Sequence, residues 1–449
     1  MKRNIKYIRI ILPLFIVCCA AGKLAAQETY NLRRCIETGL ERNYSIRIIR
    51  NEQVISNNNA SPGAAGYLPT LDLSGGLTGN LNSTRNATPD GGVEKQTNAA
   101  SESANAALNL SWTIFDGFGI QAEYSRLKEL KAMGELNTRM TIEDFIASLS
   151  GDYYTLIRQL TRLNNLASTL SLSRERLRIV EERYAIGSMS RLDLQQAQVD
   201  FNSDSSALLN QLETVHRART RLNNLMAFNN PEEIIALADS VIRPNIFLDE
   251  AQLRKSTMSN NVSLLLADKN IIVSQLDLKK AQSRNYPYLR LNAGYGYTAS
   301  NPGPAASDLQ QRLGLNYGLS VGINLFDGFN RKREQRNAAI RIQNRELLRQ
   351  ELELTLKTNM SDQWMAYENN LNLWNLEKSN LVAAQENYSI ALERYRLGDL
   401  SGIQLREAQN SLLNAEERQS IAEYATKLCE ISLLQLSGQI MTYVDSGEE

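Results

Sequence analysis

Apolar and polar residues alternate in four stretches of the chain, and each stretch predicts a β-strand. Every second residue between positions 316 and 325 is apolar, and residues 108–114 show the same period. Side chains along a strand point to opposite faces in turn, so a period of two indicates two hairpins of paired strands. The predicted strands cover residues 69–83, 104–115, 287–300 and 313–326.

The lengths and polar faces of these strands favour a membrane location. A tilted strand of roughly 9–11 residues crosses a bilayer. The polar positions carry Asn, Ser, Thr and Gly rather than Lys or Glu, which is more typical of a lumen wall than of a surface in water. A soluble antiparallel sheet with one wet face is the alternative interpretation. We expect the polar connections at residues 84–103 and 301–312 to be exposed loops.

After each predicted hairpin the apolar residues recur in steps of three, four or seven, which predicts long helices with a coiled-coil seam. Residues 119–184 contain no proline, and a continuous helix of that span would be ~100 Å long at about 1.5 Å per residue. Shorter helices are expected at about 29–60 and 247–284. The seam residues are Leu156, Leu160, Leu163, Leu170, Leu177 and Tyr184 in the first half, and Tyr367, Leu371, Trp374, Leu381, Tyr388, Leu392 and Tyr395 in the second.

A tight tip is predicted where each long helix ends, at residues 185–190 and 396–401. Gly187 and Gly398 can end a helix in the left-handed conformation. Arg183 and Arg394 lie in the last turn, where the helix dipole favours cations. We therefore expect two helical hairpins, with return helices that run to about residues 227 and 436.

The start of each return helix has the spacing of a capping box, in which two side chains satisfy exposed backbone amides. Ser190 is followed three residues later by Asp193, and Ser401 by Gln404. Both pairs are therefore predicted to begin a helix directly after the tip.

Three sequence landmarks occur twice, in the same order, which indicates an internal duplication. They are PTLDL and PYLRL at residues 69–73 and 287–291, FDGF at 115–118 and 326–329, and RYAIGSMS and RYRLGDLS at 183–190 and 394–401. The predicted organisation is a signal peptide (1–26), a first repeat (27–228), a linker (229–246), a second repeat (247–437) and a C-terminal tail (438–449).

The N-terminus has the pattern of a secretory signal peptide. Four basic residues precede an apolar run at residues 10–21, and small residues continue to Ala26. This run is too short to span a bilayer, and we expect cleavage after Ala26. A lipoprotein signal ending at Cys18 or Cys19 is the alternative. No later stretch approaches ~18 consecutive apolar residues, so any membrane insertion would use strands.

The overall composition argues against a nucleic-acid partner, because 49 basic and 49 acidic residues leave no net charge and phosphate binding needs a basic surplus. Two cysteines follow the signal, Cys35 and Cys429. They could form a disulfide in an exported protein, or remain buried free thiols. His216 is the only histidine, and the chain contains no metal-ligand cluster, phosphate-binding glycine loop or nucleophile elbow. We therefore expect neither an enzyme nor a cofactor.

Four membrane strands cannot close a barrel, because the smallest barrels have about eight strands and an open edge in lipid leaves amides unsatisfied. Two copies would give eight strands and a plugged interior, whereas three would give twelve and leave a lumen. The predicted fold is mostly α-helical with a membrane β-barrel, built from duplicated long helical hairpins and two β-hairpins per chain.

This plan resembles the TolC-like outer-membrane efflux protein family. The resemblance covers nearly the whole mature chain and depends on the duplicated plan, on FDGF before each long helix, and on the tip pattern of Arg-Tyr, Gly and Ser. It implies a homotrimer with a twelve-stranded barrel in outer-membrane lipid and a periplasmic helical tunnel. It also implies two partners, a periplasmic adaptor protein and an inner-membrane transporter that supplies the energy for otherwise passive transport.

The resemblance also implies roles for the tips, which in the family close the tunnel and contact the adaptor. A purely structural role in capping and packing is the alternative for each residue. The matching adaptor-docking candidates are Arg183, Tyr184, Gly187, Ser190, Arg394, Tyr395, Gly398 and Ser401.

Family members often carry two carboxylates, three residues apart, after the second tip, where they form an acidic constriction. The matching residues here are Gln404 and Glu407, so an amide replaces the first carboxylate. We treat both, with Asp193 of the first tip, as candidate gate residues. Gln404 is also explained by its capping box, and Glu407 by a solvated helix face.

The repeated FDGF is predicted to join strand to helix. An aromatic residue ends the strand at the bilayer interface, an aspartate caps the helix, and a glycine permits the bend. The joint residues are Phe115, Asp116, Gly117, Phe326, Asp327 and Gly328. Two other protein classes fit less well. A periplasmic adaptor would have one long helical hairpin, whereas this chain has two. A soluble coiled-coil scaffold would not need the four predicted strands.

Overall fold

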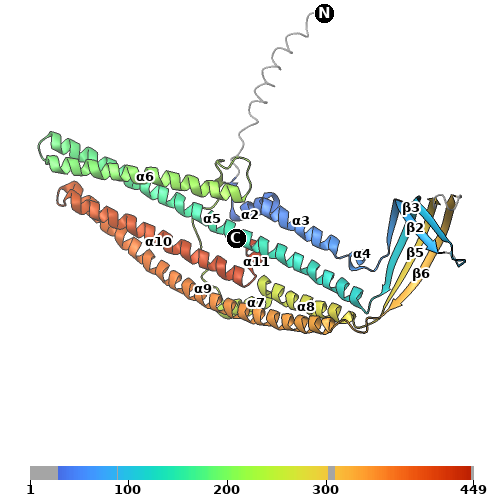
Figure 1. The fold of residues 1–449 in the computed structure, drawn as a ribbon. Coiled ribbons are helices and arrows are strands. Elements are labelled where there is room, and N and C mark those ends of the chain that lie inside the picture. The colour runs from blue at the N-terminus through green and yellow to red at the C-terminus, as the bar shows by residue number, and fades with distance from the viewer. Residues whose placement is uncertain (1–28, 88, 302–308, 446–449) are drawn as a thin grey trace, which may run out of the picture. The chain divides into compact units, whose positions relative to one another are not determined.

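The computed structural model describes residues 29–87, 89–301 and 309–445 (Figure 1). The predicted signal peptide, with Cys18 and Cys19, lies outside these residues. The chain forms two compact units. The helical unit comprises the described residues within Met1–Ile49, Arg139–Val262 and Glu353–Glu449, and the sheet unit comprises those within Arg50–Thr138 and Ser263–Leu352.

The sheet unit contains one antiparallel sheet in which the strands lie side by side in chain order. Its strands are β2 (Thr70–Ala87), β3 (Val93–Phe115), β5 (Tyr288–Asn301) and β6 (Gln310–Gly322). The central β3–β5 pair joins the first repeat to the second, with Leu108 opposite Tyr295. The two edges of the sheet, β2 and β6, have no partner strand in the described part of the chain.

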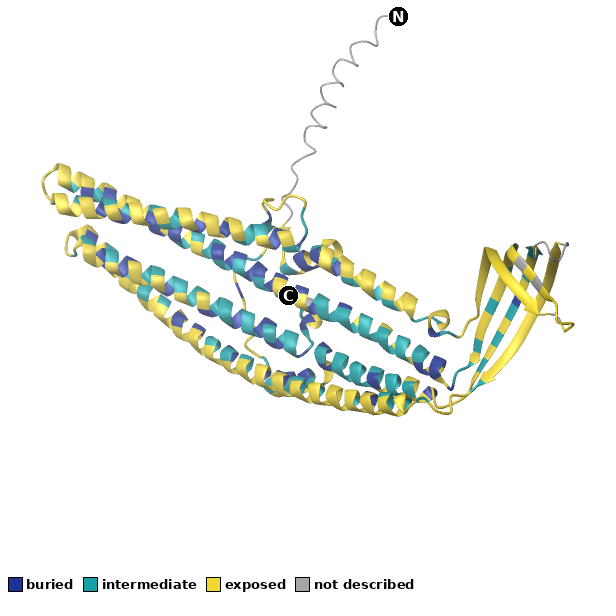
Figure 2. Ribbon diagram, in the orientation of Figure 1, coloured by how far each residue is buried: buried dark blue, intermediate teal, exposed yellow. Residues whose placement is uncertain are grey.

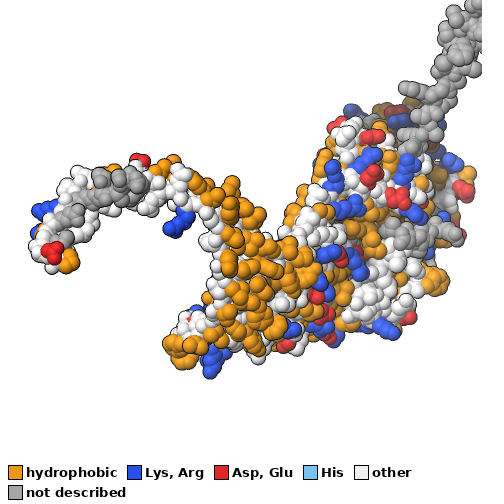
Figure 3. Space-filling model, turned by 90° about the vertical axis from the view of Figure 1, so that its right-hand side faces the viewer, with side chains coloured by type: hydrophobic (Ala, Val, Ile, Leu, Met, Phe, Trp, Pro, Cys, Tyr) orange, Lys and Arg blue, Asp and Glu red, His pale blue; other side chains and the backbone are white. Residues whose placement is uncertain are grey.

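One face of the sheet is apolar, and no described segment of the chain covers it. Leu73, Leu108, Tyr295 and Leu315 lie directly opposite one another in a row across all four strands, and all four are exposed. Hydrophobic side chains gather over this sheet in Figure 3. The protomer alone therefore leaves a large apolar surface without a partner.

The strand boundaries differ from the sequence-based ones in the first hairpin and at both ends of β6, which begins at Gln310 rather than at residue 313. The first hairpin continues to Ala87 and resumes at Val93, well inside the segment expected to be a loop, because ladder hydrogen bonds need only backbone groups. The strand β6 ends at Gly322 rather than at residue 326. Tyr288, the first residue of β5, pairs with Gly322, so the residues beyond Gly322 have no strand opposite them.

The two shorter helices expected from the sequence are each broken in two. The first is divided into α2 (Leu32–Arg42) and α3 (Tyr44–Asn59), followed by the single turn α4 (Pro62–Ala65). The second is divided into α7 (Glu250–Asn260) and α8 (Val262–Ser283). Figure 1 shows both pairs.

An asparagine occupies each break and contacts the end of a return helix. The Asn43 amide donates to the carbonyl of Leu225 at 2.9 Å, and the Asn261 amide donates to that of Leu436 at 3.0 Å. Each carbonyl belongs to the last residue of a return helix, where no intrahelical donor remains. The asparagine at each break thus supplies a hydrogen-bond donor to the carbonyl that ends a return helix. Both repeats have this arrangement.

Four further helices form the two long hairpins. The first pair is α5 (Gly119–Ala185) with α6 (Arg191–Leu225), and the second is α9 (Asn330–Leu397) with α10 (Gly402–Leu436), followed by the short α11 (Ile440–Asp445). The helices α5 and α9 have 67 and 68 residues without a break. Buried residues recur along α5 and α10, whereas much of α9 is exposed (Figure 2).

The core of the helical unit surrounds Tyr153 and Leu222 and includes Cys35. The linker is fixed to this unit at both ends. Its strand β4 (Ala236–Leu237) pairs in parallel with β1 (Thr29–Tyr30) near the start of the described chain. At the other end the ammonium group of Lys427 donates to the carbonyl of Arg243 at 3.0 Å. Cys35 and Cys429 are both free thiols.

Candidate functional site

The two hairpin tips have the same backbone conformation. Gly187 and Gly398 have φ angles of +77° and +88°, the left-handed region in which glycine meets no Cβ penalty. Their amides donate to the carbonyls of Tyr184 at 2.9 Å and Tyr395 at 3.1 Å. These bonds occupy carbonyls that the helix ends would otherwise leave without donors.

Both tips also contain a reciprocal capping box. The Asp193 amide donates to Ser190 Oγ at 3.2 Å, and the Ser190 amide donates to Asp193 Oδ2 at 3.1 Å. Ser401 and Gln404 make the same two bonds, at 3.3 and 3.2 Å. The hydroxyl and amide of Ser190 lower the pKa of Asp193, since both donate to its charged carboxylate.

The tip tyrosines lie in different surroundings. Tyr395 is 2% exposed, with Ala391, Leu405 and Ala408 in the same apolar cluster. Tyr184 is 40% exposed, so the prediction that it packs in the helical seam is wrong. It lies at the last turn of α5, where no apolar cluster of the described residues encloses it.

The first tip partly covers the second. The guanidinium carbon of Arg183 lies 5.8 Å from the centre of the Tyr395 ring, within the range of a cation–π contact. Burial raises the pKa of Tyr395, and the Arg183 charge opposes that shift. The Tyr395 hydroxyl is buried and has no hydrogen-bond partner among the described residues. Tyr395 is thus enclosed partly by its own hairpin and partly by the other.

The gate candidates of the second tip are exposed. The Gln404 side chain is engaged in its capping box, and Glu407 has no ion-pair partner among the described residues. Between them, Arg406 makes a bidentate ion pair with Asp204 of α6. Its two terminal nitrogens lie 2.6 and 2.7 Å from the two carboxylate oxygens.

Arg406 and Asp204 belong to a polar network that joins the two hairpins. The Arg176 guanidinium pairs with Asp200, and the hydroxyl of Ser173 donates to Asp204. The Gln409 amide donates to the Thr169 carbonyl at 3.3 Å. We call this network the tip clamp, and its members are Ser173 and Arg176 of α5, Asp200 and Asp204 of α6, and Arg406 and Gln409 of α10.

The tip clamp is largely withdrawn from solvent. The side chains of Asp204 and Arg406 are 8% and 17% exposed. The hydrogen bonds to Asp204 raise the pKa of Arg406 above its ordinary value. Opposite charges at this burial interact strongly, and the loss of one partner leaves a costly unpaired charge.

Sequence reasoning missed the tip clamp, although one signal pointed to it. The buried face of α6 carries Ala197, Asp200, Asp204, Gln211 and Val215 at steps of three, four and seven. Aspartates at seam positions are unusual because a buried charge needs a partner. Their partners lie on α5 and α10, and the spacing along α6 does not identify them.

The two joints have the same helix cap. The Ile120 amide donates to Asp116 Oδ1 at 3.0 Å, and the Arg331 amide donates to Asp327 Oδ2 at 2.9 Å. Each carboxylate thus satisfies an amide in the first turn of a long helix. Gly117 has a φ of +72°, and a Cβ there would lie 2.2 Å from the Ser283 carbonyl oxygen.

A phenylalanine in the left-handed region follows the glycine of each joint. Phe118 has a φ of +72° and Phe329 a φ of +64°. Each ring makes an edge-to-face contact with the first aromatic of its own motif, at centroid distances of 5.2 Å to Phe115 and 5.3 Å to Phe326. Phe115 ends β3 as expected, but Phe326 lies four residues beyond the end of β6.

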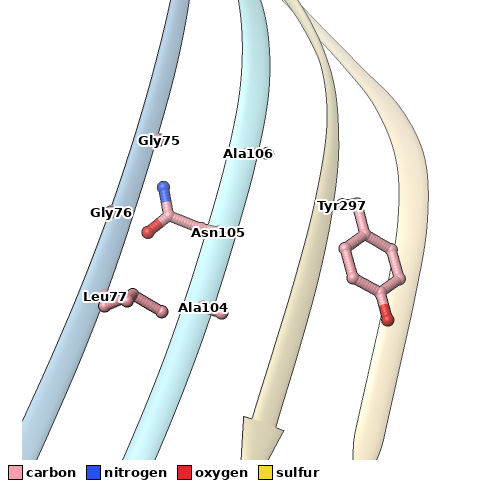
Figure 4. A pocket seen from close by; sticks show the side chains of 7 residues that line it. All are labelled: Gly75, Gly76, Leu77, Ala104, Asn105, Ala106 and Tyr297. Atoms are coloured by element: carbon pink, nitrogen blue, oxygen red, sulfur yellow. The ribbon is translucent and has the colours of Figure 1, made fainter.

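A shallow hollow of about 400 Å³ lies on the sheet (Figure 4). Small residues of β2 and β3 line it, together with Leu77 and Tyr297. The Asn105 side chain reaches toward β2, where a Cβ at Gly76 would approach its Oδ1 to 3.0 Å. The described residues that line this hollow include no charged side chain and no pair of polar groups suited to proton transfer.

The described residues contain neither a membrane-spanning helix nor a metal-binding cluster. No helix there is both long and apolar enough to cross a membrane. No group of three or more His, Cys, Asp or Glu side chains in residues 29–445, outside the two undescribed gaps, is placed to hold a metal ion.

Comparisons with known proteins agree with this architecture. The family model described as "Outer membrane efflux protein" matches residues 36–227 and 253–439. Protein CyaE of Bordetella pertussis is 22% identical over 439 residues, which cover 93% of this chain and 84% of that protein. The CmeC outer membrane channel of Campylobacter jejuni has a TM-score of 0.75 at 16% identity, over 92% of this chain and 88% of that one. The open state of the MtrE outer membrane channel of Neisseria gonorrhoeae has a TM-score of 0.71 at 17% identity, over 91% and 89%.

Proposed function

We propose, since the chain belongs to the outer membrane efflux protein family, that three copies form one conduit whose periplasmic end the tip clamp holds closed. The protein is an outer-membrane channel of the kind that serves efflux and type I secretion, with a periplasmic helical domain, and it is not an enzyme. Family members are trimers that work with the other components of tripartite pumps.

The sheet supports a trimer of this chain. Its four strands leave two unpaired edges, β2 and β6, and an uncovered apolar face. An open edge cannot persist in lipid, because each unsatisfied amide costs several kcal/mol there. Joining β6 of one copy to β2 of the next removes every edge, and three copies give twelve strands around a lumen.

The observation that carries the gating proposal is the bidentate pair between Arg406 and Asp204. It links α10 of the second hairpin to α6 of the first. Any outward movement of the second hairpin has to separate these charges. Removing one partner of such a pair leaves the other charge buried and unpaired, at a cost of about 3–5 kcal/mol. This cost falls on the closed tip, where the pair forms, so the loss of Arg406 should favour opening.

In this proposal, a periplasmic adaptor that binds the tips supplies the free energy needed to separate Arg406 from Asp204. The tips present exposed groups next to the tip clamp, including Tyr184 and the capping boxes. An adaptor that bound the tips better in the open state would shift the population toward it. An inner-membrane transporter would then supply the energy for passage. In the trimer, Glu407 would place one carboxylate per copy beside the opening, whereas Gln404 adds none.

Conductance in planar bilayers tests this proposal. We expect Arg406→Gln to raise the conductance of the purified trimer several-fold, because α10 loses its link to α6. The matched control is Arg162→Gln. Arg162 also pairs across the hairpins, with Glu417 at 2.8 Å, but its side chain is 47% exposed, and such surface pairs contribute little.

A charge exchange makes the same test more specific. Asp204→Arg combined with Arg406→Asp restores opposite charges and is expected to return the conductance toward that of the wild type. An intact Arg406→Gln trimer with unchanged conductance would refute the tip clamp as the lock. Unchanged conductance after Glu407→Gln would remove Glu407 from the constriction.

A further inference from the structure

The start of α9 carries a group of basic residues that the equivalent helix lacks. Residues 331–336 read RKREQR, with four basic side chains and one acidic. The positions 211 residues earlier, 120–125, read IQAEYS, with no basic side chain and one acidic. The duplication kept the FDGF joint in both repeats, and only the second joint has this charge.

The nearby carboxylates do not neutralise the group. Asp327 pairs with Arg331 at 3.3 Å, and Glu334 pairs with Arg284. Lys332, Arg333 and Arg336 are exposed, and none of them has an ion-pair partner among the residues that the structure describes.

These cations also lower the stability of the helix. The positive end of the helix dipole lies at its N-terminus, where added cations are unfavourable. Lys332 and Arg336 are four residues apart, and like charges at that spacing repel each other on a helix surface. Local stability therefore does not explain them, and an anionic partner would.

Two of the three positions are expected to stay accessible in the trimer. Lys332 corresponds to Gln121 and Arg336 to Ser125, and both equivalents are exposed although the start of α5 packs on α8 near Ser283. Arg333 corresponds to Ala122, which is buried. By this correspondence, a neighbouring copy beside α9 would cover Arg333 and leave the other two side chains open.

An aromatic pair lies next to the cations. Phe329 is 69% exposed and contacts Phe326 edge to face at 5.3 Å. Its left-handed φ of +64° costs free energy, so the joint presents this ring outward at some expense. Exposed aromatic rings at the end of an apolar sheet face are typical of the level where hydrocarbon meets lipid headgroups.

We propose that Lys332 and Arg336 bind the phosphates of anionic phospholipids in the outer-membrane leaflet nearest the helices. The second joint of each copy would thus be an electrostatic anchor, and the first joint would not. This inference depends on the proposed function, because it requires the sheet to lie in a bilayer. Charge complementarity selects the occupant, since a zwitterionic headgroup has no net charge to offer two adjacent cations.

The test uses the full-length trimer in detergent, titrated with short-chain phosphatidylglycerol or phosphatidylcholine, with bound lipid counted by native mass spectrometry. We expect tighter binding of phosphatidylglycerol. The double variant Lys332→Gln with Arg336→Ser gives the second joint the residues of the first. It should weaken that binding about fivefold per cation removed, the effect of one basic residue near an anionic surface.

Two controls accompany this variant. Arg341→Gln with Arg345→Ser removes the same charge from exposed positions further along α9, roughly half a turn around the helix, and should leave lipid binding unchanged. Lys332→Arg with Arg336→Lys keeps the charge and should keep the binding. Equal affinity of the wild type for the two lipids, or equal loss in the double variant and the Arg341/Arg345 control, would overturn the proposal.

Two further measurements separate this inference from the proposed function. An intact trimer band on an unheated gel and unchanged conductance would show that the double variant still forms the channel. In the wild type alone, added salt should weaken phosphatidylglycerol binding and leave phosphatidylcholine binding unchanged. Salt-independent binding would overturn the anchor even if the double variant failed to assemble.

Discussion

The two hairpin tips have the same backbone conformation but different surroundings. Both contain a glycine in the left-handed region and a reciprocal capping box. Yet Tyr395 of the second tip is buried, and its counterpart Tyr184 in the first is exposed. Tyr395 packs in an apolar cluster of its own hairpin and also contacts Arg183 of the first tip, whereas no apolar cluster of the described residues includes Tyr184.

The two repeats share their turn geometry, but they differ in how far equivalent residues are buried. Turn geometry depends on a few adjacent residues, so both copies kept it. Burial depends on neighbours from other parts of the chain, and the two hairpins have different neighbours. The second tip is therefore tied to the first through Tyr395 and the tip clamp, whereas the first tip keeps an open surface.

The largest difference between the two tips is expected when each tyrosine is replaced by alanine. Tyr395→Ala removes a buried ring and is expected to cost about 3–5 kcal/mol of local stability, whereas Tyr184→Ala should cost about 0.5 kcal/mol. Amide hydrogen exchange of the trimer, followed by mass spectrometry of peptides from each tip, measures both. Equal loss of protection at the two tips would contradict the burial difference.

Replacing the two tip glycines by alanine should destabilise both tips equally. A Cβ at Gly187 or Gly398 meets no heavy atom within 4 Å, so only the left-handed backbone opposes it. That conformation costs a non-glycine residue about 1–2 kcal/mol. We expect Gly187→Ala and Gly398→Ala to lower exchange protection by the same amount at their own tips. A markedly larger effect at Gly398 would mean that the surroundings of the second tip also constrain its backbone.

Much of this fold could be predicted from the sequence, because its determinants are local. The tips, caps and joints depend on glycine, serine and aspartate at fixed spacings, and the long helices depend on an uninterrupted apolar period. The early start of β3 at Val93 could not be predicted. Its first residues do not alternate in polarity, and backbone pairing with β2 holds them in the sheet.

The parts of the site that escaped prediction depend on contacts between distant segments. Arg406 and Asp204 are 202 residues apart, and nothing in either local sequence names the other. The same reason applies to the linker, where β4 pairs with residues near the start of the described chain. A single sequence shows that Asp204 lies on a buried face, but only the fold shows which cation reaches it.

The smallest expected difference between the tips is their response to pH. Asp193 accepts hydrogen bonds in its charged form, so its folded pKa is lower than the ordinary value of 3.8. A lowered carboxylate pKa adds stability above the unfolded value and loses it as the pH falls through the folded one. The first tip should therefore lose protection in acid. The second should not, because its capping residue, Gln404, does not titrate.

Two substitutions exchange this property between the tips. Asp193→Asn should weaken the first tip by about 0.5 kcal/mol at neutral pH, the size of one charge–dipole interaction at a helix start, and by nothing once the wild-type carboxylate is itself protonated. Gln404→Glu should give the second tip the acid sensitivity that the first has lost. Hydrogen exchange compared between variant and wild type at the same pH cancels the intrinsic pH dependence of exchange. If Asp193→Asn weakened the first tip equally at both pH values, the lost interaction would be the hydrogen bond and not the charge.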